Sequence, residues 1–385
     1  MTEKTPDLIE EEYSYKKLLT ETILESYPKY MQDNLLRSME KSDVLSLRKR
    51  RKNNGKNLLD LSEVEETTDR ISQAIESEEA AVKFIEKNEY FKPYKYSAIF
   101  YVDKVDDSLL GKLIEDGEVY DFFDSKFDND NTTTNVGMVK PTMYSVGNTI
   151  MFKFSKTLTG YNPGSDERKQ IKYPVIVIYS KIRGTLEVRL DSTRSIFRTG
   201  DLFYESQIAV VVSWFTKNLQ TNIRIINFPP IIEHIKRTKS SEVVVDAQSM
   251  AFKNGGKAVL ENGINQNYVL PLLGELKELM IMHEELFSKS PEIKVIIERF
   301  ITEAETLSNL PWVTLLWKSD KTKVKFIFGA DDDTFTILQY YGRKSDMEKM
   351  DYVTQYIIEN RDELDRKEEA ESEQDESVPS DIPAV

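Results

Sequence analysis

Apolar residues recur first at helical spacing and then at strand spacing along the chain. In residues 7–41, apolar and charged positions alternate with a helical period that is interrupted at Pro28. Residues 58–87 continue as a long acidic helix whose apolar residues share one side. From Tyr96 the period changes to two, and β-branched and aromatic residues dominate, as they do in strands. The pattern predicts a helical N-terminal region that ends near residue 92.

Turn residues between short apolar runs predict three β-hairpins in the rest of the chain. The first spans residues 175–190 and turns near Gly184, the second joins 243–252 to 258–260, and the third joins 312–317 to 324–328. In the second strand of the first hairpin, apolar residues alternate with Glu187, Arg189 and Asp191. Such alternation is typical of a strand with one solvated face, so we expect these three side chains to be exposed.

Helical patterns separate and follow the hairpins. A helix is predicted from Asp201 to Leu219, and residues 271–288 and 291–307 form a helical pair with matching apolar stripes. The last helix begins at Ser345, where Glu348 completes a capping box. Beyond residue 360 the sequence becomes polar and acidic, which predicts a disordered tail.

These elements define an α+β fold, in which a helical N-terminal region precedes mixed, largely antiparallel sheets packed with helices and a disordered acidic C-terminal tail. At 385 residues, the chain exceeds the size at which one hydrophobic core keeps growing. We predict a helical region at 1–92, an α+β domain at 93–265, a helical pair with a hairpin and a C-terminal helix at 266–360, and the tail at 361–385.

The composition excludes several classes of protein. With 39% hydrophobic and 31% charged residues, the chain suits a globular fold, and it has no apolar run long enough for a transmembrane helix. No signal-peptide pattern opens the sequence, so we expect a soluble, cytoplasmic protein with no membrane partner. The absence of cysteine excludes disulfides, thiolate metal sites and cysteine nucleophiles. Two histidines, His234 and His283, are too few for a three-histidine metal site.

Charge is segregated along the chain, whose net charge is −14. Residues 165–240, which we call the basic middle segment, contain thirteen basic and seven acidic residues. The predicted tail contains three basic and ten acidic residues. Five basic residues gather around the first hairpin with aromatic residues between them, namely Lys181, Arg183, Arg189, Arg194 and Arg198.

Basic residues of this kind bind phosphates, and interleaved aromatic rings stack on bases. Two interpretations of the basic middle segment therefore stay open. It contacts nucleic acid, or it pairs with acidic regions of the protein itself. A shorter basic segment at residues 48–56 allows either a phosphate-binding arm or a solvated loop.

Catalytic signatures are sparse. The sequence has no glycine-rich phosphate loop, nucleophile elbow or zinc-protease motif. His234 is expected on a short surface helix and His283 on an apolar stripe, so both suit structural roles. The acidic groups at residues 103–107 and 331–333 are candidates for holding a hard cation, but they have the composition of ordinary turns.

One degenerate motif resembles the metal site of a nuclease. Such a site needs an acid on one strand and an acid-x-lysine on the next, which hold a divalent ion and a positive charge at the scissile phosphate. Glu187 and Arg189 supply the acid and a basic residue, although arginine replaces lysine. Asp103 and Asp191 are the candidates for the partner acid.

The lack of a complete catalytic constellation favours a non-catalytic interaction or regulatory protein. Its expected partner is another protein or a second copy of itself, with nucleic acid as a further candidate at the basic middle segment. No cofactor and no metal is expected under this hypothesis. The alternative is a metal-dependent nuclease that needs a divalent ion. A composition rich in Asn, Lys, Ile and Tyr is typical of a low-GC coding sequence. Because unfamiliar bacterial chains of this kind often belong to mobile elements or phage defence, we expect a component of such a system.

Overall fold

The computed structural model divides the chain into two compact units, each built from two stretches of sequence. Unit 1 comprises Met1–Lys92 and Val102–Ile223, and unit 2 comprises Pro93–Tyr101 and Arg224–Val385. The structure describes residues 15–49, 58–123, 140–162, 164, 167–251, 257–261, 271–306, 309–329, 334–342 and 347–376. The basic segment at 48–56 and the acidic group at 331–333 lie wholly or mostly outside these ranges.

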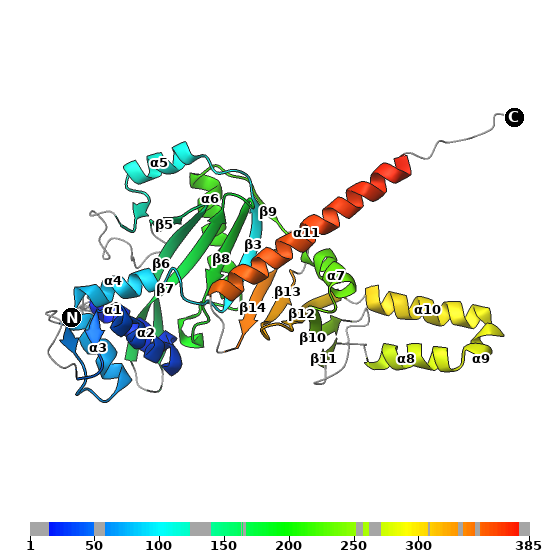
Figure 1. The fold of residues 1–385 in the computed structure, drawn as a ribbon, viewed down its shortest axis with the longest axis horizontal. Coiled ribbons are helices and arrows are strands. Elements are labelled where there is room, and N and C mark those ends of the chain that lie inside the picture. The colour runs from blue at the N-terminus through cyan, green and yellow to red at the C-terminus, as the bar shows by residue number, and fades with distance from the viewer. Residues whose placement is uncertain are drawn as a thin grey trace, which may run out of the picture. The chain divides into compact units, whose positions relative to one another are not determined.

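Unit 1 opens with four helices that share a hydrophobic core. They are α1 (Tyr15–Ser26), α2 (Lys29–Lys41), α3 (Thr67–Ser77) and α4 (Glu79–Asn88), and β1 (Leu45–Ser46) pairs in parallel with β2 (Leu59–Asp60) between them (Figure 1). Leu19, Ile23, Leu36 and Ile75 are buried in this core. The predicted interruption at Pro28 is confirmed. The single helix expected at 58–87 is instead two helices, because Glu78 adopts an extended conformation between them.

The sheet of unit 1 is a meander of long strands. Its elements are β4 (Tyr120–Asp121), β5 (Thr142–Val146), β6 (Thr149–Asn162), β7 (Glu167–Ser180) and β8 (Thr185–Leu190), in the order β8-β7-β6-β5-β4. Helices α5 (Asp107–Glu115) and α6 (Phe203–Asn218) and the short 3-10 helix Ser195–Phe197 complete the unit. The first predicted hairpin is confirmed, and Gly184 occupies its turn with a positive φ of 58° that favours glycine.

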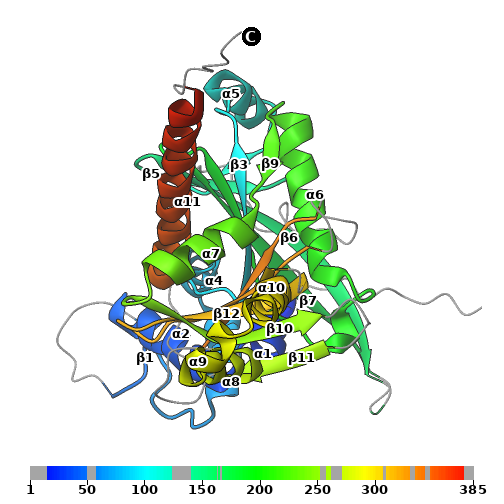
Figure 2. The ribbon, with the colours of Figure 1, turned by 90° about the vertical axis from the view of Figure 1, so that its right-hand side faces the viewer.

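The two faces of this sheet differ in chemistry. Phe152 and Phe154 lie on one face and contact Trp214 and Phe215 of α6, which runs alongside β6 in Figures 1 and 2. Alternation along the strands places a set of charged side chains on the opposite face, namely Lys153, Lys172, Glu187 and Arg189. All four are at most 3% exposed. The prediction that Glu187 and Arg189 face solvent is therefore wrong.

Unit 2 is built from antiparallel strands with their own helices. The strands are β3 (Tyr96–Val102), β10 (Val243–Ala251), β11 (Lys257–Glu261), β12 (Asn309–Trp317), β13 (Lys323–Ile327) and β14 (Ile337–Tyr341), in the order β11-β10-β12-β13-β14-β3, and β9 (Ile223–Ile225) pairs with β3. The helices are α7 (Phe228–Thr238), α8 (Pro271–Met282), α9 (Glu284–Ser288), α10 (Pro291–Thr306) and α11 (Met347–Glu376). The second and third predicted hairpins are confirmed.

Helices α7 and α11 cover one face of the unit 2 sheet. Phe228 of α7 contacts Phe326, with ring centroids 5.8 Å apart, and Tyr356 of α11 contacts Trp317 at the same distance. His234 of α7 is 3% exposed, so the prediction of a surface position is wrong. Burial lowers its pKa, and Glu363 of α11 lies 3.6 Å from its Nε2.

Helix α11 runs to Glu376, beyond the residue 360 at which the sequence pattern placed the start of the tail. Charged pairs one turn apart support this extension, for example Arg361 with Asp365 at 3.0 Å and Lys367 with Glu363 at 3.3 Å. Residues 377–385 lie outside the described residues. The predicted α+β class, with mostly antiparallel strands and a helical N-terminal region, is confirmed. In the described part of the chain, every helix is too short or too polar to cross a membrane.

Candidate functional site

A buried charged cluster joins the helices of unit 1 to the polar face of its sheet. It consists of Glu86 of α4, Glu89 at the C-cap of that helix, Lys153 of β6 and Lys172 of β7. The two glutamates are three residues apart and therefore lie on the same side of α4. Each of the four side chains is at most 1% exposed. We call these four residues the charged cluster.

Each lysine in the charged cluster contacts both glutamates. Lys153 Nζ donates to Glu86 and lies 2.9 Å from Glu89 Oε2, and Lys172 Nζ donates to Glu86 and lies 2.7 Å from Glu89 Oε2. Further hydrogen bonds complete the arrangement. Lys153 Nζ donates to the main-chain oxygen of Glu86 at 2.9 Å, and Tyr15 OH accepts from Lys172 at 3.1 Å and donates to Glu86. Two positive and two negative charges are thus enclosed together, and the cluster is neutral.

The surroundings shift the pKa values of Glu86 and Lys153 towards the ionised forms. Burial by itself would raise the pKa of Glu86, but the charges of Lys153 and Lys172 and their hydrogen bonds lower it to about 2. Burial would likewise lower the pKa of Lys153, and the charges of Glu86 and Glu89 outweigh it and raise that pKa. Burial, followed by the negative charges of Glu89, Asp191 and Glu86, raises the pKa of Tyr27 well above its usual value.

A second ion pair, in which the lysine is buried, lies next to this cluster. Lys92 Nζ donates to Asp191, and the Lys92 side chain is only 2% exposed. The same ammonium lies 5.2 Å from the centroid of the Tyr27 ring. Because the residues of the charged cluster and Lys92 are paired and buried, their chemistry suits holding α4 against the sheet better than receiving a substrate.

The residues of the degenerate nuclease motif do not meet around a common point. Glu187 Oε2 accepts from Arg189 Nη2 at 2.7 Å within the buried face of β8. Asp191 instead pairs with Lys92. Asp103 follows β3, and its main-chain NH donates to the oxygen of Asn222. Among the residues that the structure describes, no group of three or more His, Asp or Glu side chains is placed to hold a metal ion. The nuclease alternative stays a hypothesis.

The acidic group at residues 103–107 has local structural roles. Asp106 caps α5 by accepting from the NH of Ser108 at 2.8 Å, and hydrogen bonds from the side chain and the main chain of Ser108 lower the pKa of Asp106. Asp107 forms an ion pair with Lys181 at 2.7 Å. His283 is exposed at the junction of α8 and α9, outside the apolar contact predicted for it.

The five basic residues predicted to contact nucleic acid fall into two separate groups and one buried position. Lys181 and Arg183 lie in the turn before β8, whereas Arg194 and Arg198 follow its other end. Six strand residues between the two groups span about 20 Å. Arg189, in the middle of β8, is 0% exposed.

Acidic residues of the same unit neutralise much of the basic middle segment. Glu25 of α1 accepts from both Arg194 and Lys169, which lowers the pKa of Glu25 against the opposing effect of burial. Lys181 pairs with Asp107 and Lys172 with the two glutamates of the charged cluster. These contacts correspond to the second of the two interpretations of the segment, pairing within the protein.

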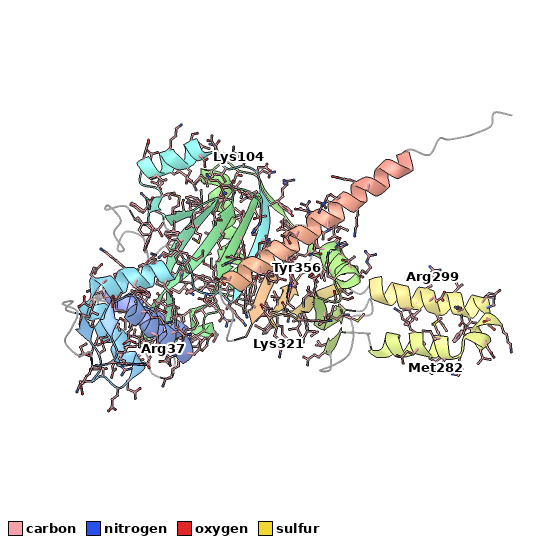
Figure 3. All side chains as sticks on the ribbon, in the orientation of Figure 1. Arg37, Lys104, Met282, Arg299, Lys321 and Tyr356 are labelled. Carbon is pink, nitrogen blue, oxygen red and sulfur yellow. The ribbon has the colours of Figure 1, made fainter. Side chains whose placement is uncertain are left out.

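Helices α8 and α10 form an antiparallel hairpin in unit 2 that exposes much apolar surface (Figure 1). Its small core contains Met280 and Ile301, with Leu276, Phe287 and Ile297 packed against them. The helical pair predicted from the apolar stripes is therefore present. Figure 3 shows Met282 and Arg299 on the outer sides of the two helices. Eight large apolar side chains of the hairpin are 45–73% exposed, namely Leu279, Ile281, Met282, Leu286, Ile293, Val295, Ile296 and Phe300.

Four of these side chains share one face of the hairpin. Leu279, Ile296 and Phe300 each directly precede a residue of the small core, and Ile293 lies three residues before Ile296 on the same stripe. Consecutive residues are rotated by about 100° around the helix axis, so a residue that directly precedes a core residue lies to one side of the core. Because the two helices run antiparallel, these residues lie on the same side of the pair in both helices. We call Leu279, Ile293, Ile296 and Phe300 the apolar hairpin face. The residues that follow core positions form the opposite face and include the charged Lys277 and Glu298.

Unit 1 also contains one small hollow of about 210 Å³ beside α6. Phe154, Val210, Val211 and Trp214 line most of it, with Ser213, Lys217 and Asn218 at the polar positions. This lining supplies neither a carboxylate nor a histidine for acid–base chemistry.

No protein-family model and no curated protein matches the sequence.

Proposed function

We propose that this chain is a non-catalytic interaction protein that associates with a second copy of itself through the apolar hairpin face. The observation that carries the proposal is the exposure of Leu279, Ile293, Ile296 and Phe300, which is 45%, 52%, 66% and 57%. Contiguous exposed apolar side chains on one side of an element mark interaction surfaces in globular proteins.

The size of this face suits a weak dimer. Large side chains each offer roughly 150 to 250 Å². With Met282 at its edge, the face therefore presents roughly 500 Å² per copy, and two copies bury about 1,000 Å², the lower bound of a specific interface. We expect a dissociation constant in the micromolar range.

An identical copy is the occupant that the charges favour. Residues 276–301 contain four basic and five acidic residues, so the hairpin has a net charge of −1 in a chain of −14. Repulsion between two copies is thus smallest here. A face made mainly of apolar side chains is also complementary to itself, as a two-fold symmetric interface requires.

The test is the oligomeric state of the full chain, measured by sedimentation equilibrium from about 1 to 200 μM. The wild type is expected to dimerise, and Phe300→Glu should weaken the dimer at least 100-fold, because it buries a charge without a partner. Val295→Glu is the matched control. Val295 is 60% exposed on the same helix but lies away from the apolar hairpin face, so this variant should dimerise like the wild type.

Circular dichroism should show equal helix content and equal melting in all three proteins, since both substituted residues are exposed. A wild type that stays monomeric at 200 μM overturns the proposal. Equal weakening by the two substitutions also overturns it, because it removes the connection between dimerisation and this face.

A further inference from the structure

The sheet of unit 2 has a second face that α7 and α11 do not cover. Side chains alternate along each strand, so Val324 and Phe326 point to the helix-covered side, while Lys323 and Lys325 point to the other. Cross-strand pairing puts Tyr341 opposite Lys323 and Gln339 opposite Lys325. We call this side, with Trp312, Lys323, Lys325, Gln339 and Tyr341, the aromatic sheet face.

Two lysines at this face lie against aromatic rings. Lys325 Nζ is 3.8 Å from the centroid of Trp312, and Lys95 Nζ is 4.5 Å from the centroid of Tyr341. Tyr341 is 38% exposed, and both lysines are half-buried. Burial lowers the pKa of Lys95 and of Lys325.

Neither Lys95 nor Lys325 has a carboxylate within ion-pair distance among the residues that the structure describes. Lys95 Nζ donates to the main-chain oxygen of Tyr340 at 2.6 Å, which leaves its charge unmatched. Their neighbour Lys323, in contrast, pairs with Asp246 at 2.6 Å. In the basic middle segment, Lys169, Lys172 and Lys181 are also matched by carboxylates. Two half-buried cations beside aromatic rings therefore distinguish this face.

These groups match a ligand that combines anions with flat apolar rings. A single-stranded nucleic acid has both, because its phosphates pair with ammonium groups and its unstacked bases stack on aromatic side chains. A duplex hides the faces of its bases and does not fit. We propose that the aromatic sheet face binds single-stranded nucleic acid, with bases on Trp312 and Tyr341 and phosphates at Lys325 and Lys95.

The register of the sheet gives the proposed site its length. Trp312 pairs with Ile327, two residues from Lys325, and Lys325 pairs with Gln339, two residues from Tyr341. Strand spacings of about 4.8 Å and rises of about 3.4 Å per residue place Lys325 midway between two rings roughly 17 Å apart. Sheets that bind single-stranded RNA accommodate two or three bases on their surface, which agrees with this span.

Fluorescence anisotropy tests the proposal with the full chain and labelled ten-nucleotide oligo-dT and oligo-rU near 50 mM salt. Both oligonucleotides offer phosphates and unstacked bases, and the comparison of their affinities tells whether DNA or RNA is preferred. Trp312→Ala is expected to weaken binding at least tenfold through loss of stacking. Lys325→Gln should weaken it and reduce the slope of log K against log salt by about 0.7, as the loss of one phosphate contact requires, whereas Lys325→Arg should retain that slope.

Arg183→Gln is the matched control, since Arg183 is an exposed cation of the basic middle segment. It should bind like the wild type. No retention of either oligonucleotide overturns the proposal, as does binding that Arg183→Gln weakens and Trp312→Ala leaves unchanged. Equal affinity for a duplex of the same length overturns it as well. Sedimentation of the same variants separates this result from the dimer proposal, because none of them alters the apolar hairpin face.

Discussion

Replacing Glu86 with Gln is expected to lower the free energy of unfolding by about 3 to 5 kcal/mol, the range for removing one partner of a buried ion pair. Glutamine preserves the volume of the side chain but leaves Lys153 and Lys172 with Glu89 as the only carboxylate of the charged cluster. One positive charge then stays buried without a counter-charge. Urea denaturation of the full chain measures the loss, and hydrogen exchange of peptides from α4 and β7 localises it.

Two further variants make this result specific. Asp107→Asn removes the exposed pair with Lys181, in which the side chains are 63% and 36% exposed, and should cost no more than about 1 kcal/mol. Adding Lys153→Met to Glu86→Gln restores neutrality with Lys172 and Glu89 and should recover part of the stability. A loss from Glu86→Gln as small as that from Asp107→Asn would show that the charged cluster does not hold α4 to the sheet.

The stability of the protein is expected to fall by roughly 3 kcal/mol between about pH 5 and pH 2 through Glu86 alone, at about 1.4 kcal/mol per pKa unit. The pKa of this carboxyl is about 2 in the folded protein and ordinarily 4.5. Its contribution is therefore fully present above the ordinary value and is lost as the pH falls towards the folded value. Lys153, whose pKa is raised, contributes below its ordinary value of 10.5 and loses that contribution as the pH rises further.

Urea midpoints measured across this pH range test the expectation, with Glu86→Gln as the comparison. The variant has no carboxyl at position 86, so its midpoint should change less between pH 5 and pH 2 than that of the wild type. An equally large fall of the urea midpoint between pH 5 and pH 2 in both proteins would contradict the assigned role of Glu86.

Local sequence patterns predicted the parts of the fold whose cause is local. Pro28 cannot continue a helix, and α1 and α2 are separated there. Gly184 supplies the positive φ of the first hairpin turn. The alternation in β8 was also recognised, but an alternating strand does not reveal whether its charged face meets water or other charges. Glu187 and Arg189 are buried as a pair, which the pattern alone cannot indicate.

The charged cluster was missed because its members are far apart in the sequence. Glu86 and Lys172 are 86 residues apart, and Glu86 lies in the stretch 58–87, which carries many other acids. Lys153 offers the one local signal, since it lies between Phe152 and Phe154 in a long strand. Conversely, Lys181 and Arg183 are close in sequence to Arg194 and Arg198, but the length of β8 separates the two groups in space. Proximity along a strand is a poor measure of proximity in space.

The order in which the chain is synthesised has a consequence for unit 2. Strand β3 pairs with β14, and the paired residues Ser97 and Leu338 are about 240 positions apart. At roughly 5 to 20 residues per second, a ribosome releases β14 about 12 to 50 seconds after β3. During that interval the β14-facing edge of β3 has no partner strand, and the synthesis of unit 1 ends about halfway through it, at Ile223. Chains released early, before residue 337, therefore expose the hydrogen-bonding groups of this edge, and we expect them to be the forms that aggregate or recruit chaperones during expression.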